Sequence, residues 1–279
     1  MIMSQNTSGN NQSGEQNIEG ITRAVIGLDM LERYTGTLAH EIQDYILLTN
    51  FSRYLTEFQA MHPTSELREG SGFRSVNWKE GGISIIDYKI GSPTAALVMD
   101  LLSYRKPKAV LMLGMCGGLN KKLKVGDFVL PMAAIRDDGT SNHYMPVRVP
   151  ALPTFNIQKV ASQILDENKL LFRTGVIHTT DYRFWEFDDV FKEKLREERA
   201  IAIDMECATL FVVGFARKVA IGALMLVSDL PLTREGIKTK SSANSVFKEY
   251  TSLHLKSGIE TLTRLKDLSS DSDLRHYEW

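Results

Sequence analysis

Cysteine is scarce in this sequence: only Cys116 and Cys207 occur among 279 residues, and both lie inside apolar runs. Two such thiols cannot form the disulfide network that stabilises many small secreted domains. Neither shows a sequence sign of thiolate activation, so a cysteine nucleophile is not expected. We therefore expect a cytoplasmic protein in which both thiols are reduced and buried.

Net charge and long apolar runs are also lacking. The formal net charge is −1, which gives no electrostatic reason to expect nucleic acid or an anionic membrane as a partner. No apolar run is long enough to span a bilayer, and no signal peptide is visible. No two of the six histidines have metal-ligand spacing, and neither a P-loop nor a full dinucleotide fingerprint occurs. We therefore expect no metal, no nucleotide cofactor and no membrane partner.

What the sequence does contain is an alternation of strand-like and helix-like segments. We expect strands at 83–88, 109–113, 126–130, 173–178, 200–203 and 221–227, and helices at 24–59, 95–103, 156–165, 205–217 and 242–265. The pattern predicts one α/β domain over residues 21–266, with a central mixed, largely parallel sheet flanked by helices. Residues 1–20 are expected to form a disordered tail and residues 267–279 a loose, charged tail.

Two acids stand at the edges of apolar segments. Glu206 lies between the strand at 200–203 and the following helix, and Asp229 follows the strand at 221–227. In open α/β sheets ligands bind at the carboxyl ends of strands, so we expect both acids to face a substrate. The alternative is that both are hydrogen-bonded structural acids. Asp204 is expected to anchor the start of the helix.

Three loops could add ligand contacts. Gly91–Thr94 and Gly114–Gly118 are predicted glycine turns, whose backbone N–H groups suit an anion but which also fit simple tight packing. The loop Thr179–Glu186 interleaves aromatic and cationic side chains. This combination suits a flat heteroaromatic ring and a phosphate, although aromatic side chains in loops are also commonly just packed.

In this order the motifs resemble those of the nucleoside phosphorylase superfamily, in the branch of purine nucleoside and uridine phosphorylases, and within it the AMP nucleosidase family. The most specific are Thr-Thr-Asp-Tyr-Arg-Phe-Trp-Glu at 179–186 and the segment from Asp229 to Lys238. The resemblance covers residues 25–265 and implies the catalytic domain alone, with a nucleoside-phosphorylase-like fold. It implies hydrolysis of AMP to adenine and ribose 5-phosphate by a homo-oligomer built from dimers, expected to be a hexamer.

The resemblance also implies roles for individual residues. Asp229 corresponds to the general acid that protonates adenine N7, and Glu206 to the carboxylate that binds the ribose 2′ and 3′ hydroxyls. Met205 would lie under the ribose. Further substrate contacts are expected from Phe184, Trp185, Gly117 and Ser228. The candidates for holding the 5′-phosphate are Lys238 and Arg136, which we favour, and Arg53, Arg183, Arg234 and Ser92.

One departure from the superfamily favours water as the nucleophile. Met112 and Met115 stand where the phosphorylases have an Arg and a Ser or Thr that hold inorganic phosphate. A methionine cannot hold an oxyanion, so hydrolysis is favoured. Two alternatives stay open: a nucleoside phosphorylase, which the uridine-phosphorylase-like run Asp138–Ser141 would suit, and a nucleotide-binding sensor without turnover. The presence of both Glu206 and Asp229 disfavours the sensor, which needs no general acid.

Overall fold

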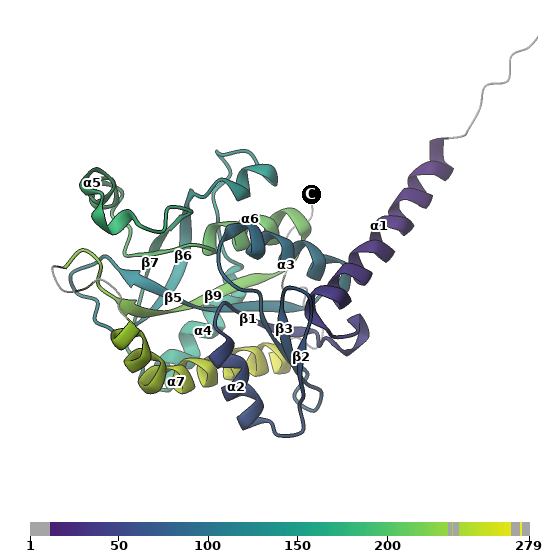
Figure 1. Ribbon diagram of the computed structural model, residues 1–279, viewed down its shortest axis with the longest axis horizontal. Helices are drawn as coiled ribbons and strands as arrows, with labels where there is room; N and C mark the ends of the chain where they lie inside the picture. The colour runs from purple at the N-terminus through teal and green to yellow at the C-terminus, as the bar shows by residue number, and fades with distance from the viewer. Residues whose placement is uncertain (1–11, 234–235, 237–239, 269–273, 275–279) are drawn as a thin grey trace, which may run out of the picture.

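A nine-stranded mixed sheet forms the centre of the chain in the computed structural model, which describes residues 12–233, 236, 240–268 and 274 (Figure 1). The strand order is β2-β3-β4-β1-β5-β8-β7-β6-β9, and β9 also pairs with β5, so the last five strands close on themselves. The strands are β1 Tyr45–Thr49, β2 Leu67–Glu69, β3 Arg74–Trp78, β4 Ile83–Asp87, β5 Ala109–Gly118, β6 Phe128–Asp137, β7 Phe172–Thr180, β8 Ala202–Asp204 and β9 Ile221–Asp229.

Parallel pairing prevails in the middle of this sheet. The pairs β1–β4, β1–β5, β5–β9, β6–β7 and β7–β8 are parallel, whereas β2–β3, β3–β4, β5–β8 and β6–β9 are antiparallel. The predicted α/β domain with a mixed, largely parallel sheet is thus confirmed.

Helices cover both faces of the sheet, which explains why its strands are apolar on both sides. α3 and α6 pack together on one face with α1, and α4 and α7 on the other with α2 (Figure 1). Along β1, Ile46 and Leu48 join one hydrophobic cluster and Leu47 joins the other. The helices are α1 Gln12–Thr35, α2 Ser52–Met61, α3 Ser92–Arg105, α4 Phe155–Glu167, α5 Asp189–Glu198, α6 Cys207–Arg217 and α7 Lys240–Leu268, with 3₁₀ helices η1 Ala39–Glu41, η2 Thr140–His143 and η3 Trp185–Phe187.

Two of the predicted elements were wrong in part. The helical stretch expected over 24–59 is interrupted by β1, a buried central strand. The predicted glycine turn Gly114–Gly118 is the end of β5, whose register with β9 shifts between Cys116 and Gly117. The elements β2, β3 and α5 were not predicted.

The ends of the chain differ from the expectation as well. α1 already begins at Gln12, within the stretch expected to be a disordered tail, and α7 runs two residues beyond 266. Leu274, in the expected loose C-terminal tail, is buried in the hydrophobic core, and residues 1–11, 269–273 and 275–279 lie outside the described residues. Within the described part, no helix has both the length and the apolar character needed to cross a membrane.

Candidate active site

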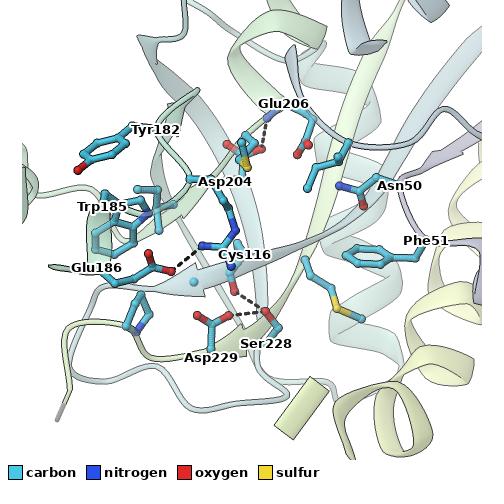
Figure 2. A pocket seen from close by; sticks show the side chains of 17 residues that line it. Asn50, Phe51, Cys116, Tyr182, Trp185, Glu186, Asp204, Glu206, Ser228 and Asp229 are labelled. Carbon is cyan, nitrogen blue, oxygen red and sulfur yellow. Dashed lines mark hydrogen bonds and ion pairs between the residues drawn. The ribbon is translucent and has the colours of Figure 1, made fainter. Parts of the chain in front are cut away.

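A cavity lies where the ends of several strands meet, as expected for an α/β sheet (Figure 2). Its walls come from the residues that follow β1, β4, β7 and β8 and from the last residues of β5 and β9. Seven of the predicted site residues line it: Asp229, Glu206, Met205, Trp185, Gly117, Ser228 and Arg183. The remaining lining residues are Asn50, Phe51, Ile90, Met115, Cys116, Tyr182, Glu186, Ile203, Asp204 and Pro231.

Glu206 is a buried carboxylate held from two sides. Its Oε1 accepts a hydrogen bond from the backbone N–H of Gly91 at 2.7 Å, and the side chain of Asn50 also hydrogen-bonds to it. Burial, followed by the nearby charge of Asp204, raises the pKa of Glu206 to about 8, against the smaller opposing effect of these hydrogen bonds. The group can therefore exchange a proton close to neutral pH.

Asp204 holds the chain at the start of α6. Its carboxylate accepts hydrogen bonds from the Thr179 hydroxyl at 2.6 Å and from the backbone N–H groups of Cys207 at 2.7 Å and Glu206 at 3.2 Å. These bonds confirm the predicted anchoring role. They fix the backbone on which the Glu206 side chain stands.

Asp229, the last residue of β9, reaches the cavity from the opposite wall. The Ser228 hydroxyl donates to Asp229 Oδ1 at 2.6 Å, which orients the carboxylate. Asp229 is the register partner of Gly117 in β5. A Cβ on Gly117 would lie 2.9 Å from Pro231 Cγ and 3.1 Å from Ile203 Cγ2, so only glycine fits at this point of the wall without displacing a neighbour.

The loop after β7 supplies one side of the cavity. Trp185 and Glu186 are both 5% exposed, and Arg183 Nη1 donates to Glu186 Oε1 at 2.6 Å. Phe184, which was expected to border the base, is 71% exposed and does not line the cavity. Its ring instead lies under the Arg183 guanidinium, 5.9 Å from its centre. In this loop Tyr182, Arg183, Trp185 and Glu186 line the cavity, whereas Phe184 lies outside it.

Three of the expected phosphate ligands are engaged elsewhere. All three nitrogens of the Arg136 side chain donate hydrogen bonds within residues 141–149, at 2.6–3.1 Å. The Ser92 hydroxyl donates to the Met205 carbonyl at 2.8 Å, and Arg53 pairs with Glu57 at 3.0 Å. None of the three lines the cavity.

Three phosphate candidates remain. Among the described residues, Arg183 is the candidate that lines the cavity. Lys238 and Arg234 lie outside the described residues.

This chain is similar to known proteins over most of its length. Residues 44–251 match the family model described as "Phosphorylase superfamily". The chain belongs to the phosphorylase superfamily. It is 31% identical to AMP nucleosidase of Escherichia coli K12 over 88% of this chain and 59% of that protein, so it spans about three fifths of that relative's length.

Two further members of the superfamily are similar to this chain. A crystal structure of AMP nucleosidase from Bacteroides thetaiotaomicron is 36% identical and superposes with a TM-score of 0.79, covering 89% of this chain and all of that one. Uridine phosphorylase of Treponema pallidum is 26% identical over 70% of this chain and 81% of that protein.

Met112 and Met115, which stand where the phosphorylases hold inorganic phosphate, differ in burial. Met112 is fully buried in the core, where the Tyr88 hydroxyl contacts its sulfur at 3.6 Å. Met115 lines the cavity. A thioether has no N–H or O–H to donate to an oxyanion, so neither side chain provides a site for inorganic phosphate.

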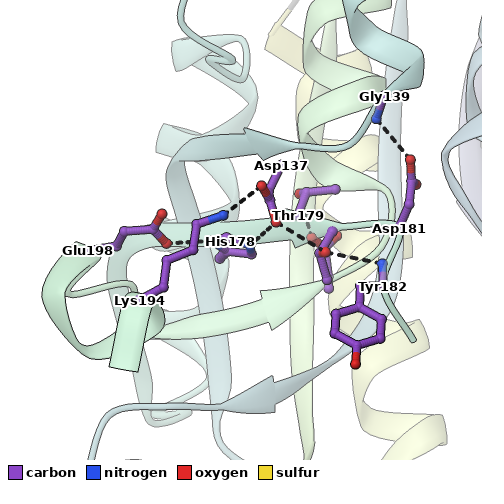
Figure 3. Close-up of polar contacts among 10 residues, drawn as sticks. Asp137, Gly139, His178, Thr179, Asp181, Tyr182, Lys194 and Glu198 are labelled. Carbon is purple, nitrogen blue, oxygen red and sulfur yellow. Dashed lines mark hydrogen bonds and ion pairs between the residues drawn. The ribbon is translucent and has the colours of Figure 1, made fainter. Parts of the chain in front are cut away.

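A polar network outside the cavity supports the loop after β7 (Figure 3). His178, fully buried on β7, lies between Glu198 of α5 at 2.7 Å and Asp137 of β6 at 3.3 Å. Lys194 of α5 contacts the other oxygen of Asp137 at 2.7 Å. These contacts fix α5 against the sheet, and the loop that carries Trp185 and Glu186 runs directly into α5.

Sequence reasoning missed part of the cavity wall. Asn50 and Phe51 follow β1, which was itself not predicted, so nothing indicated that they end a strand. Tyr182 and Glu186 belong to the loop that was singled out, yet contacts were assigned there only to Arg183, Phe184 and Trp185. The available signal for Glu186 was its place as a carboxylate between the aromatic residues Trp185 and Phe187.

Proposed function

We propose that this protein hydrolyses the N-glycosidic bond of AMP and releases adenine and ribose 5-phosphate. The observation that carries the proposal is the pair Glu206 and Asp229 on the walls of one cavity, next to Met115 in place of an oxyanion ligand. The similarity to two AMP nucleosidases at 31% and 36% identity supports the choice of substrate.

Asp229 is the proposed general acid. Its protonated carboxyl group donates to adenine N7 while the electron pair of the C1′–N9 bond passes to the base. The Ser228 hydroxyl, 2.6 Å from Oδ1, holds the carboxyl group in one orientation. Water then adds to C1′ and gives up a proton to the Asp229 carboxylate, which restores the acid, so that adenine leaves neutral and ribose 5-phosphate forms.

Glu206 is the proposed partner of the ribose. In its ionised form the carboxylate accepts hydrogen bonds from the 2′ and 3′ hydroxyls and stabilises the positive charge that develops on the sugar ring. The Gly91 N–H and Asp204 keep it in place before substrate arrives. Met205, whose carbonyl is held by Ser92, provides the apolar surface under the ribose.

The remaining contacts follow from the same arrangement. Trp185 borders the adenine, and Lys238 is the proposed ligand of the 5′-phosphate, since the Arg183 guanidinium is paired with Glu186. We also infer a cytoplasmic homo-oligomer built from dimers, a hexamer. Phe184, Phe187 and Val190, beside the cavity loop, are 71%, 76% and 83% exposed, which supports a neighbouring subunit at this position.

Incubation without phosphate tests the proposal directly. The protein is incubated with AMP and, separately, with adenosine, and the free base is followed by chromatography. We expect adenine and ribose 5-phosphate from AMP with no phosphate requirement. Cleavage of adenosine only, and only after inorganic phosphate is added, would contradict the proposal and identify a phosphorylase.

A further inference from the structure

Glu186 carries a buried oxygen whose partner is missing from the described part of the chain. The side chain is 5% exposed and lines the cavity (Figure 2). Its Oε1 accepts a hydrogen bond from Arg183, whereas Oε2 is buried and has no hydrogen-bond partner among the described residues. A buried acceptor without a donor is costly, so such an atom at a cavity wall is suited to a donor on the ligand.

The position of Glu186 indicates which part of a ligand would supply that donor. In Figure 2 the carboxylates of Glu186 and Asp229 lie on the same side of the cavity, while Glu206 and Asn50 lie on the other. If Asp229 contacts N7 of a purine, the next group along the same edge of the ring is the substituent on C6. Glu186 is therefore placed near the position that distinguishes a 6-aminopurine from a 6-oxopurine.

The 6-amino and 6-oxo substituents have opposite hydrogen-bonding character. An amino group donates hydrogen bonds, and an oxo group only accepts them. A carboxylate paired with a guanidinium also only accepts, so it would bind the amino group and repel the oxo oxygen. The ion pair with Arg183 holds Oε1, which leaves Oε2 as the oxygen available to the base.

We propose that Glu186 is a specificity-determining residue that accepts a hydrogen bond from the 6-amino group and selects aminopurine over oxopurine nucleotides. This inference rests on the proposed function, since it assumes that the cavity binds a purine nucleotide with N7 at Asp229. A site built to hydrogen-bond a substrate group discriminates strongly against an analogue without it, because its own polar atom is then left unpaired.

The test compares kcat/KM for AMP and IMP in the wild type, in Glu186→Gln and in Asp189→Asn. The carboxamide introduced by Glu186→Gln would offer both a donor and an acceptor, so the AMP-to-IMP ratio is expected to fall about tenfold or more. Asp189→Asn is the matched control, because it neutralises a carboxylate three positions away that is 95% exposed and paired only with Lys192 in the described structure. Its ratio should equal that of the wild type.

Two results would overturn the inference, and they are distinguishable. Equal losses for AMP and IMP in Glu186→Gln would mean that Glu186 only supports Arg183 and the loop. Release of no base from AMP by the wild type would refute the proposed function and the inference with it.

A second measurement needs no substitution, and so covers the case in which Glu186→Gln does not fold. Adenine and unsubstituted purine are compared as inhibitors of AMP cleavage by the wild type. We expect purine, which lacks the amino group, to inhibit about tenfold more weakly. Equal inhibition would overturn the inference.

Discussion

The backbone N–H of Gly91 donates a hydrogen bond to Glu206 Oε1 at 2.7 Å, although 115 positions separate the two residues in the sequence. Gly91 directly precedes α3 and has a φ of 97° and a ψ of 156°, a conformation that other L-residues rarely adopt. The backbone N–H of the glycine turn that was expected to suit an anion thus donates to a carboxyl group of the protein itself, that of Glu206.

Replacing Gly91 by alanine should therefore affect both stability and the position of Glu206. An added Cβ would find room, since its nearest neighbour would be Pro93 Cδ at 3.8 Å. The cost comes from the backbone conformation, and we expect the free energy of unfolding to fall by about 1–3 kcal/mol. AMP cleavage should fall about tenfold, as the N–H turns away from Glu206. Denaturant unfolding and steady-state kinetics measure the two effects.

Gly139→Ala is the matched control for this prediction. Gly139 has a φ of −82°, which alanine adopts readily, and its added Cβ would approach no atom closer than 3.7 Å. Its unfolding free energy and kcat/KM should remain close to those of the wild type. An equal effect of both substitutions would show that the conformation of Gly91 is not what matters.

Glu206→Gln should make the protein more stable and much less active. In the unfolded chain Glu206 has an ordinary pKa of about 4.5, whereas burial raises it to about 8 in the folded protein. The folded state binds this proton more tightly, so the free energy of unfolding falls as pH rises from about 4.5 to about 8. Glutamine removes that loss and should gain up to a few kcal/mol over the wild type above about pH 8. Activity should fall about 100-fold, because the charge is gone.

Urea unfolding of both proteins at about pH 5 and about pH 8.5 measures the stability difference. The difference should be small at the lower pH and large at the higher one. Asp204→Asn provides the internal control: it keeps an acceptor oxygen but removes the charge that helps to raise the pKa of Glu206. In Asp204→Asn the free energy of unfolding should therefore stop falling at a lower pH than it does in the wild type. An unchanged pH dependence in both variants would contradict the assignment.

The placement of Glu206 and Asp229 at one cavity was predictable from the local sequence. Each stands at the end of an apolar segment, and the ends of neighbouring strands meet at one place in such a sheet. β1 was missed because all five of its residues are buried on a central strand between two layers of helices. Its side chains do not alternate between apolar and polar, so the segment merges with the helical patterns on either side.

The surroundings of the site were harder to predict, because they depend on contacts distant in sequence. Arg136 resembled a free cation, yet its main acceptors are backbone carbonyls of the following excursion, which no side-chain pattern reveals. Ser92 likewise serves a carbonyl 113 positions away. The difference between Phe184 outside and Trp185 inside the cavity wall is set by how the loop turns before η3, and both side chains are aromatic.

Asp229→Asn should strongly reduce turnover while AMP still binds. Asparagine has nearly the same shape and can keep the hydrogen bond with the Ser228 hydroxyl, but it has no acidic proton to give to N7. We expect product formation to fall about 10²- to 10⁴-fold, with AMP affinity within about threefold of the wild type. Rapid-quench product analysis and equilibrium binding to the same preparation measure the two quantities. Joint loss of binding and turnover would instead make Asp229 a ligand or a structural residue.

Arg136→Lys should lower the stability of the protein and leave substrate binding unchanged. Arg136 donates to Ser141, Asn142, Met145, Pro146 and Val149. Lysine keeps the charge but cannot reproduce this planar arrangement of donors, so the free energy of unfolding should fall by about 1–3 kcal/mol. The KM for AMP should stay near that of the wild type.

Lys238→Gln provides the contrasting variant, because Lys238 is a proposed ligand of the 5′-phosphate. It should raise the KM for AMP about tenfold or more, since a cation that binds the phosphate is lost. Inhibition by adenine, which has no phosphate, should not change. If Arg136→Lys instead raised the KM for AMP without lowering stability, Arg136 would have to contact the substrate. Because its own donors are directed away from the cavity of its chain, that contact would then belong to the site of a neighbouring subunit.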